Sequence, residues 1–479
     1  MSNSRQACVA SSGNIYFTDL DNACIRKIAL DGTISTVAGT GTAGYSGDGG
    51  AATSAQLAGP QWVCVDSSEQ LYIADTGNNC IRKIALDGTI STVAGTGTAG
   101  YSGDGGAATS AKINNPTGLC VDSSGKIYIS DFYNNLIRMF TVGGTISTVA
   151  GTGVAGYSGD GGAATSAQIR GAYGISVDSS GGLYISDTGN NCIRMFTVGG
   201  TISTVAGTGT AGYSGDDIAA TSAQINAPRS VLIDSLGAIY IGDTENQRIR
   251  RFTVGGNIST IAGTGTAGYS GDEGVSTSAT LRGPRGIDVD SLGNIYIGDA
   301  DNNVIRRLLL QVTFSGGSST LAVTTNAPIG LTDTTAAAGT VQVSSGKRAI
   351  LREAPTGSHT LTVDGGGALA IHTAFNSSAT PMEVSGSGTI LQVSGAGKLP
   401  NAATSVDSGA TLQLGSSTES SVAHGAIPGA ADVASGGIIA VAANTSVPND
   451  AFTAATIHSG AILKLGSGST FAQSINVVA

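Results

Sequence analysis

Five tyrosine–aspartate pairs are the residues of this chain best suited to chemistry. Each pair stands in the motif Tyr-Ser-Gly-Asp, and consecutive copies are 56 residues apart. The pairs are Tyr45 and Asp48, Tyr101 and Asp104, Tyr157 and Asp160, Tyr213 and Asp216, and Tyr269 and Asp272. A phenol and a carboxylate repeated in this way predict either an aromatic and acidic recognition surface or weak calcium sites completed by backbone carbonyls.

A structural role for the same pairs is the alternative. Each tyrosine would pack on its own loop, and each aspartate would cap a glycine-rich turn. Regular repetition favours this alternative, because structural devices recur in every repeat whereas specific ligand sites usually do not. Apart from weakly bound calcium, no cofactor is predicted.

Histidine and cysteine offer little to catalysis in the repeated region. The histidines are His359, His372, His424 and His458, so no Ser-His-Asp relay or histidine-bound metal is available earlier in the chain. The cysteines follow the repeat in two sets, Cys8, Cys64 and Cys120, and Cys24, Cys80 and Cys192. Four positions in other copies carry small or apolar residues instead, which predicts core packing rather than disulfides or a metal site. These are Ser176, Leu232, Leu136 and Val304.

The unit that positions these side chains is a repeat of short strands. In the copy from Gly59 to Gly95, four runs of five to seven residues, rich in β-branched and aromatic side chains, are separated by turn residues. Leu71 and Ile73 would face one way and Tyr72 and Ala74 the other, as in a sheet covered on both faces. Six such four-stranded sheets predict an all-β fold, a six-bladed β-propeller over residues 1–312.

A second repeated phrase, Asp-x-x-Asn-x-x-Ile-Arg, supports the same architecture. Together with Pro-x-Gly and a hydrophobic-x-Val-Asp run before it, this phrase resembles the NHL-repeat family. One copy shows the pattern whole, in Pro116, Gly118, Val121, Asp122, Tyr128, Asp131, Asn134, Ile137 and Arg138. The resemblance implies a propeller that binds protein, RNA or glycan more often than an enzyme.

The ends of the repeated region predict how the ring closes. The chain enters at a first strand over residues 5–10 and leaves at a fourth strand over residues 312–316. No exchange of strands between the termini is evident, so closure would depend on packing between blades. Each copy also carries an arginine predicted to lie mid-strand between blades, where it needs carbonyls or the repeated aspartates as partners. These are Arg26, Arg82, Arg138, Arg194, Arg250 and Arg306.

One position of the repeat carries side chains of different chemical types from copy to copy, and this variation predicts a binding site. Just before the innermost strand, at the mouth of the central channel, the copies carry Arg5, Gln61, Thr117, Tyr173, Arg229 and Arg285. The three arginines fall in neighbouring blades of a closed ring and would hold a carboxylate or sulfate of a partner. Alternatively, they pair with Asp216, Asp217 and Asp272. Trp62, the only tryptophan, would fill or flank the same mouth.

Residues 313–479 have a different composition, dominated by glycine, serine, alanine and threonine. Two short apolar runs around a Ser-Gly turn recur at steps of roughly twenty residues, which predicts the rungs of a parallel β-helix. This region resembles the β-solenoid repeats of autotransporters and adhesins. The chain is therefore predicted to consist of a propeller, 1–312, and a solenoid, 313–479.

Composition restricts the partners. The net charge of -10 is dispersed, so binding of nucleic acid by a basic patch is not expected. No apolar run reaches the ~18 residues of a membrane span. The N-terminus lacks the pattern of a secretory signal peptide. An extracellular surface or a virion is nevertheless the favoured location.

We predict a non-enzymatic surface or appendage protein, either a cell-surface adhesin or a virion fibre component. Its propeller would bind a protein or glycan on a surface, and its solenoid would serve as a stalk or attachment arm. The solenoid would also join copies into a homo-oligomer. One alternative is an enzyme of the six-bladed lactonase or lyase type, which the near-identical copies and missing histidines disfavour. Another is a purely structural lattice component.

Overall fold

The computed structural model describes residues 2–235, 237–272, 274–290 and 293–308, and beyond Leu308 only the backbone of a series of strands. By internal contacts the chain divides into two compact units. The first comprises Met1–Asp290 and Ile295–Leu308.

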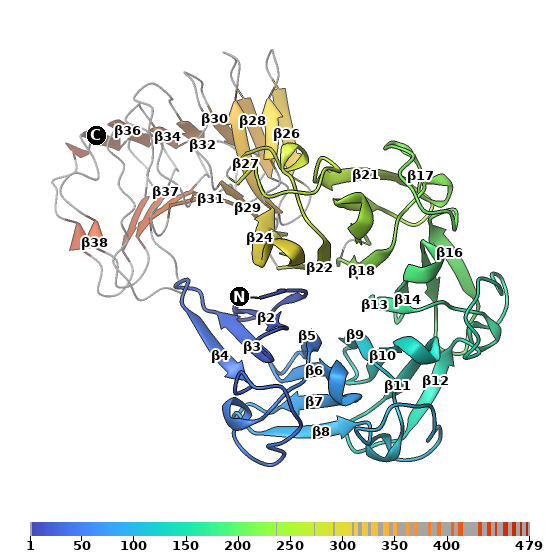
Figure 1. The fold of residues 1–479 in the computed structure, drawn as a ribbon. Helices are drawn as coiled ribbons and strands as arrows, with labels where there is room; N and C mark the ends of the chain where they lie inside the picture. Colours follow the sequence, from blue (N-terminus) through green and yellow to red (C-terminus); the bar gives the residue numbers. More distant parts are fainter. Residues whose placement is uncertain are drawn as a thin grey trace. The chain divides into compact units, whose positions relative to one another are not determined.

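The first unit is a six-bladed β-propeller, with one antiparallel sheet for each sequence copy (Figure 1). Blade 1 contains β1 (Ala7–Val9), β2 (Ile15–Asp19), β3 (Cys24–Ile28) and β4 (Ile34–Ala38). Blade 2 contains β5 (Pro60–Val65), β6 (Leu71–Asp75), β7 (Cys80–Ile84) and β8 (Ile90–Ala94). Blade 3 contains β9 (Pro116–Val121), β10 (Ile127–Asp131), β11 (Leu136–Phe140) and β12 (Ile146–Ala150).

The remaining blades vary slightly in strand number. Blade 4 contains β13 (Ala172–Val177), β14 (Leu183–Asp187), β15 (Cys192–Phe196) and β16 (Ile202–Ala206). Blade 5 contains β18 (Pro228–Ile233), β19 (Ile239–Asp243), β20 (Arg248–Phe252) and β21 (Asn257–Ala262), and a short β17 (Ile218–Ala219) pairs with the edge of β21. Blade 6 contains β22 (Pro284–Val289), β23 (Ile295–Asp299) and β24 (Val304–Leu308).

Single-turn 3₁₀ helices lie at two places in the repeat. One set lies in the loops between blades: η1 (Ala52–Ser54), η3 (Ala108–Ser110), η5 (Ala164–Ser166), η7 (Ala220–Ser222) and η9 (Ser276–Ser278). The other follows the second strand of a blade: η2 (Thr76–Asn78), η4 (Phe132–Asn134), η6 (Thr188–Asn190), η8 (Thr244–Asn246) and η10 (Ala300–Asn302).

The second strands show why the blades pack face to face. All five residues of β6, β10, β14, β19 and β23 are buried, as expected for sheets that are apolar on both faces. The apolar cores lie between blades, so that Tyr128 of blade 3 packs in one cluster with Ile175 and Ile185 of blade 4. No blade could bury these faces alone, and each therefore depends on its neighbours.

The fourth strand predicted for the sixth copy, over residues 312–316, is wrong. Blade 6 has three strands, and β25 (Gln311–Phe314) pairs in parallel with β27 (Ala327–Asp333) of the second unit instead. In earlier copies a turn such as Asp87-Gly88 leads into the fourth strand, whereas apolar residues follow Leu308 directly. The sequence after Leu308 therefore lacks the turn that would reverse the chain into an outer strand.

Ring closure joins β1 to β22 without exchange of strands among the described residues. The backbone N–H of Gly286 donates to the carbonyl oxygen of Arg5 at 2.7 Å. The N–H of Val9 donates to Asp288 Oδ2 at 2.7 Å. A small apolar cluster containing Ala7, Phe17 and Tyr296 fills the same junction. Closure therefore depends on blade packing, as predicted, reinforced by these hydrogen bonds.

Glycine permits close approach of strands at the hub, and this gives a first prediction. A Cβ atom on Gly118 of β9 would lie 3.0 Å from the Cα of Gly174 and 3.0 Å from the nitrogen of Ile175, both backbone atoms of β13. We expect Gly118→Ala to lower the free energy of unfolding by about 2 kcal/mol, because the blades must separate to admit the methyl group. Urea denaturation measures the change, with Gly50→Ala, whose nearest neighbour would be 3.4 Å away, as the control. Equal stability of the two variants would contradict the close-packed hub.

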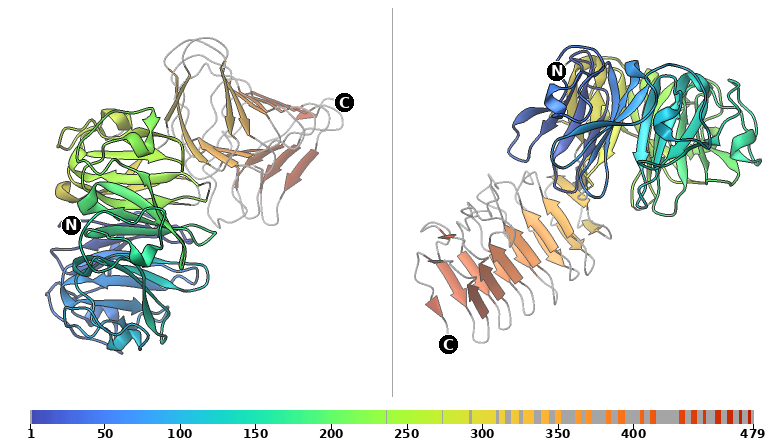
Figure 2. Two further views of the ribbon diagram at one scale, coloured as in Figure 1. Left: turned by 90° about the vertical axis from the view of Figure 1, so that its right-hand side faces the viewer. Right: turned by 90° about the horizontal axis from the view of Figure 1, so that it is seen from below.

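The second unit consists of parallel strands, drawn as successive arrows in Figure 2. One sheet contains β25, β27, β29 (Arg348–Leu351), β31 (Ala368–Ile371), β33 (Ile390–Val393), β35 (Thr411–Leu414), β37 (Ile438–Val441) and β40 (Ile462–Leu465). The other contains β26 (Ser319–Val323), β28 (Gly339–Val343), β30 (Leu361–Asp364), β32 (Met382–Val384), β34 (Thr404–Val406), β36 (Ala430–Val433), β39 (Ala454–Ile457) and β42 (Asn476–Val477). A separate pair is formed by β38 (Ser446–Val447) and β41 (Thr470–Phe471). The four histidines lie outside the described residues, and the parallel β-helix stays a prediction.

Candidate functional site

Each Tyr-Ser-Gly-Asp loop binds an arginine of the blade that follows it. In blade 2 the Arg82 side chain is fully buried, and its Nη2 donates to Asp48 Oδ1 at 2.7 Å. Its Nη1 donates to Asp75 Oδ2, from the end of β6, at 3.3 Å. The guanidinium also lies over the ring of Tyr45, 5.0 Å from the centroid. We call this set of Tyr, loop Asp, strand Asp and Arg the interblade clamp.

The interblade clamp recurs in blades 3 to 6. The arginine-to-loop-aspartate distances are 2.5 Å for Arg138 and Asp104, 2.6 Å for Arg194 and Asp160, 3.1 Å for Arg250 and Asp216, and 2.7 Å for Arg306 and Asp272. Backbone carbonyls accept further hydrogen bonds, such as that from Arg138 to Lys112 at 2.8 Å. The structural role and both kinds of partner predicted for these arginines are confirmed for five of the six, whereas Arg26 donates to Thr36 instead.

The loop tyrosines and aspartates thus contact the next blade, and Tyr101, Tyr213 and Tyr269 also donate a hydrogen bond to the aspartate of their own loop. The tyrosines stay between 38% exposed, at Tyr213, and 57% exposed, at Tyr269. Because part of each tyrosine ring stays exposed, the recognition surface predicted for these residues remains a prediction. The carboxylates of the loop aspartates pair with the clamp arginines. Within the described part of the chain, no group of three His, Cys, Asp or Glu side chains is placed to hold a metal ion.

The predicted channel-mouth residues meet around Tyr173, at the start of β13. The phenol of Tyr173 donates a short hydrogen bond to Gln61 Oε1 and accepts one from Arg5 Nη1 at 3.3 Å. The guanidinium of Arg229 lies over the Tyr173 ring, 5.6 Å from its centroid. The Trp62 ring is 6.5 Å from the same centroid. One tyrosine therefore connects side chains from four blades.

The three arginines of the mouth are close enough to influence one another. Burial, and then the positive charges of Arg5 and Arg229, lower the pKa of Arg285. The Nε and Nη1 atoms of Arg285 and the Nε of Arg229 are buried without hydrogen-bond partners. A concentration of cationic donors that the protein does not satisfy is suited to bind an anion.

The acidic partners expected for these arginines were wrong. Asp216 and Asp272 belong to interblade clamps, while Arg229 and Arg285 lie nearest to Glu245, at 3.9 Å, and Asp301, at 3.6 Å. Both acids are about half exposed, and such long, solvated pairs contribute little. In the sequence, both acids directly precede the asparagine of the Asp-x-x-Asn turn, as Asp21 does in the first copy.

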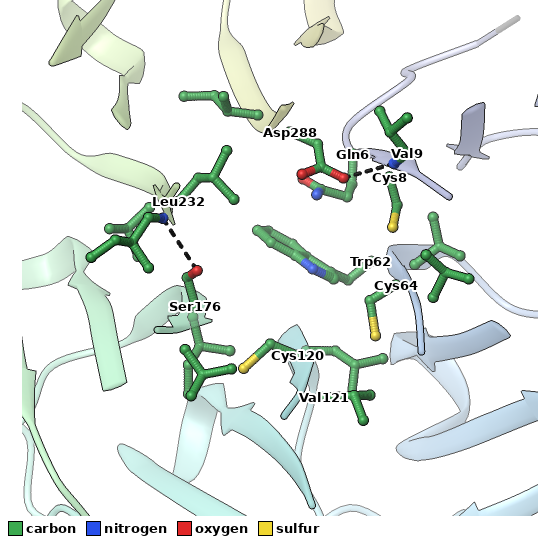
Figure 3. Close-up of a pocket in the computed structure, with 18 residues that line it drawn as sticks. Gln6, Cys8, Val9, Trp62, Cys64, Cys120, Val121, Ser176, Leu232 and Asp288 are labelled. Carbon is green, nitrogen blue, oxygen red and sulfur yellow. Dashed lines mark hydrogen bonds between the residues drawn. The ribbon is translucent and has the colours of Figure 1, made fainter. Parts of the chain in front are cut away.

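Beneath the mouth, the innermost strands of the six blades enclose a cavity of about 260 Å³ (Figure 3). At one position of the repeat, the copies contribute Cys8, Cys64, Cys120, Ser176, Leu232 and Asp288 to its wall. The predicted core packing is confirmed for Cys24, Cys80 and Cys192, which are buried. Cys8 is buried in an apolar cluster as well, and together with the partly buried Cys64 and Cys120 it also lines this cavity. Burial raises the pKa of the Cys8 and Cys64 thiols, so these groups are neutral at physiological pH.

Asp288 is a residue of the cavity that the sequence reasoning missed. Its carboxylate accepts hydrogen bonds from the backbone N–H groups of Val9, at 2.7 Å, and Val289, at 2.8 Å. Burial raises its pKa to about 6, against these two hydrogen bonds, which favour the charged form. Its sequence register, the same as that of Cys8, would have placed it in the channel. Figure 3 shows the carboxylate facing Val9 across the junction of blades 6 and 1.

Family models match this chain within its repeated region. A family model described as the teneurin NHL domain matches residues 97–157, and the NHL repeat model matches residues 57–84 and 172–196. The chain carries NHL repeats. The NHL propeller of this chain is therefore confirmed both in sequence and in its six blades.

Relatives of the NHL region are long proteins. Teneurin-3 of Danio rerio is 32% identical over 284 residues, which are 50% of this chain and 10% of that protein. The chloroplastic protein SUPPRESSOR OF QUENCHING 1 of Arabidopsis thaliana is 27% identical over 256 residues, 50% of this chain and 24% of that protein. This chain thus spans a small part of the curated relatives that it matches.

Solved structures resemble the fold distantly. A structural-genomics protein of Bacteroides thetaiotaomicron is 19% identical with a TM-score of 0.48, over 64% of this chain and 69% of that one. A streptogramin B lyase is 18% identical with a TM-score of 0.40, over 65% and 84% of the two chains. Likeness at this level does not bear on function. Among the described residues, no helix is long and apolar enough to span a membrane.

Proposed function

We propose that the NHL propeller is a non-enzymatic platform that binds an anionic group of a protein or glycan at the channel mouth. The cluster of Arg5, Arg229 and Arg285 around Tyr173 carries this proposal, because it contains buried guanidinium nitrogens without partners. Carboxylates and sulfates offer the oxygen acceptors that such nitrogens lack. Trp62 and Tyr173 are buried beside these arginines and hold the cluster in place rather than offering surface to a partner.

The other parts of the chain support the same kind of protein. Similarity to the teneurin NHL domain supports a cell-surface protein that adheres through its propeller. The in-register parallel pairing of successive strands after Leu308 supports a β-helical stalk or attachment arm. A virion fibre and a structural lattice have no comparable support.

An enzyme of the lactonase or lyase type is the competing proposal. Its best support is Asp288, the one carboxylate of the cavity, whose pKa of about 6 suits a general base. Two backbone N–H groups already occupy that carboxylate, however, and the thiols beside it are neutral. We therefore favour binding over catalysis.

The test replaces the three mouth arginines by serine and measures binding to arrays of proteins and acidic glycans. We expect ligands of the wild-type chain to bind at least about tenfold more weakly, since charge-assisted hydrogen bonds are lost. The matched control replaces Lys27, Arg251 and Arg307 by serine, which removes the same charge from the same three blades away from the mouth. Equal binding by the two triple variants would contradict the proposal, and turnover of a lactone by the wild type would favour the enzyme.

A further inference from the structure

The outermost strands of blades 2 to 5 are covered by the loop that precedes each blade. In blade 2, Gly49 N–H donates to the carbonyl of Ile90 at 2.8 Å, and Ile90 N–H donates to the carbonyl of Gly50 at 3.0 Å. Ala52 N–H adds a bond to Gly88 at 2.9 Å. The loop thereby extends the sheet and leaves Ile90 fully buried. The equivalent residues Ile146, Ile202 and Ile258 are fully buried as well.

Blade 1 has the same outer strand without that cover among the described residues. Ile34, which occupies the position of Ile90, is 45% exposed. Its strand β4 carries the same sequence, Ile-Ser-Thr-Val-Ala, as β8. The difference therefore arises from the loop contacts, which no described residue supplies to β4, rather than from the strand itself.

The polar groups of the clamp are also incomplete in blade 1. Arg26 donates from Nη1 to Thr36 Oγ1 at 3.0 Å, and its Nε is buried without a partner. No ion pair of Arg26 is found in the described part of the chain, whereas Arg82 has two. In blade 2, Asn78 donates to both Asp75 and the loop carbonyl of Gly44. Its counterpart Asn22 donates to Asp19 at 2.9 Å and lacks the loop acceptor.

We propose that the outer face of blade 1, formed by Asn22, Arg26, Ile34 and Thr36, is a docking groove for an added peptide segment. The segment would have the chemistry Tyr-Ser-Gly-Asp-Gly-Gly. Its aspartate would pair with Arg26, its tyrosine would lie on the guanidinium and bond to Thr36, and its backbone would bond to Ile34. This is addition of a strand to a sheet edge with specificity from side chains.

Charge and geometry select this occupant. In five clamps of the same molecule, the arginine at this position pairs with a carboxylate at 2.5 to 3.1 Å. The guanidinium also lies over a tyrosine ring, as Arg82 does over Tyr45. The five loops of this kind among the described residues are already bound in their own clamps, so none of them is the occupant. The groove lies apart from the arginine cluster of the mouth, and the inference does not depend on the function proposed above.

The experiment titrates the 479-residue chain with a synthetic peptide that has the sequence of residues 40–57, followed by calorimetry. We expect saturable binding of one peptide per chain. A peptide with asparagine in place of the aspartate should bind at least tenfold more weakly. Ile34→Asp, at an exposed side chain that the fold does not need, should abolish binding, and so should Arg26→Met.

The controls separate docking from general effects. Arg251→Ser, on the outer side of blade 5, should bind the peptide like the wild type, and thermal melting should show that Ile34→Asp is folded. Absence of binding to the wild-type chain would overturn the proposal. So would binding that survives both Ile34→Asp and Arg26→Met. Loss of peptide binding with unchanged binding at the channel mouth would confirm that the two surfaces are separate.

Discussion

Arg138→Met is expected to lower the free energy of unfolding by about 3–5 kcal/mol, because it removes one partner of a buried charge network. The guanidinium of Arg138 is fully buried and contacts Asp104 at 2.5 Å and Asp131 at 3.6 Å. Asp131 is itself fully buried, so its carboxylate would lose a counter-charge without gaining water. Two loop carbonyls, of Ser102 and Lys112, would also lose their donor.

Denaturation by urea, followed by circular dichroism of the whole chain, measures this effect. The structure offers a matched control in Arg26→Met, which changes the same repeat position in blade 1. Since Arg26 has a hydrogen bond to Thr36 but no ion pair in the described residues, we expect it to cost about 1 kcal/mol. Adding Asp131→Asn to Arg138→Met should restore part of the stability. Similar losses for the two single variants would show that the interblade clamp does not stabilise the ring.

Asp288→Asn is expected to remove about 3 kcal/mol of the change in stability between pH 4 and pH 7. In the folded protein the pKa of Asp288 is about 6, raised by burial from 3.8. The folded state therefore keeps a proton that the unfolded chain has already released. The stability linked to Asp288 is present below about pH 4 and is lost as the pH rises through 6.

The measurement compares wild-type and variant unfolding at pH 4, 5, 6 and 7. The clamp aspartates Asp75, Asp131, Asp187 and Asp243, whose pKa values burial also raises to about 6, are present in both proteins and cancel. Ser176→Ala alters the same register in blade 4 without a titrating group and should keep the wild-type pH profile. A profile of Asp288→Asn parallel to the wild type would mean that the carboxyl is solvated.

Much of the fold could be read from local patterns. The runs around Leu71 and Ile73, and their recurrence at a fixed step, were sufficient for six sheets because each strand repeats the same apolar alternation. The partners of the arginines followed from the cost of burying a guanidinium without acceptors. Both features depend on residues close in the repeat, which a single sequence displays directly.

The features that were missed or wrongly predicted depend on how strands pair in space. Asp288 looked unremarkable because its role arises only when β22 meets β1 at ring closure. Glu245 and Asp301 lie beside Arg229 and Arg285 of the same blade, because the start of the first strand pairs with the end of the second. The fourth strand predicted after Leu308 was wrong because the sequence lacks a turn there. A missing turn is harder to recognise in a sequence than the apolar residues that suggested the strand.

The interblade clamp has a consequence for the history of the gene. Its loop aspartate and its arginine are 34 residues apart, as in Asp48 and Arg82, so one copy of the repeat encodes the whole device. Tandem duplication of one unit would then add a blade already equipped to attach to its predecessor. The number of copies would be limited by the junction between Val9 and Asp288, because this hydrogen bond forms only when the last blade contacts the first.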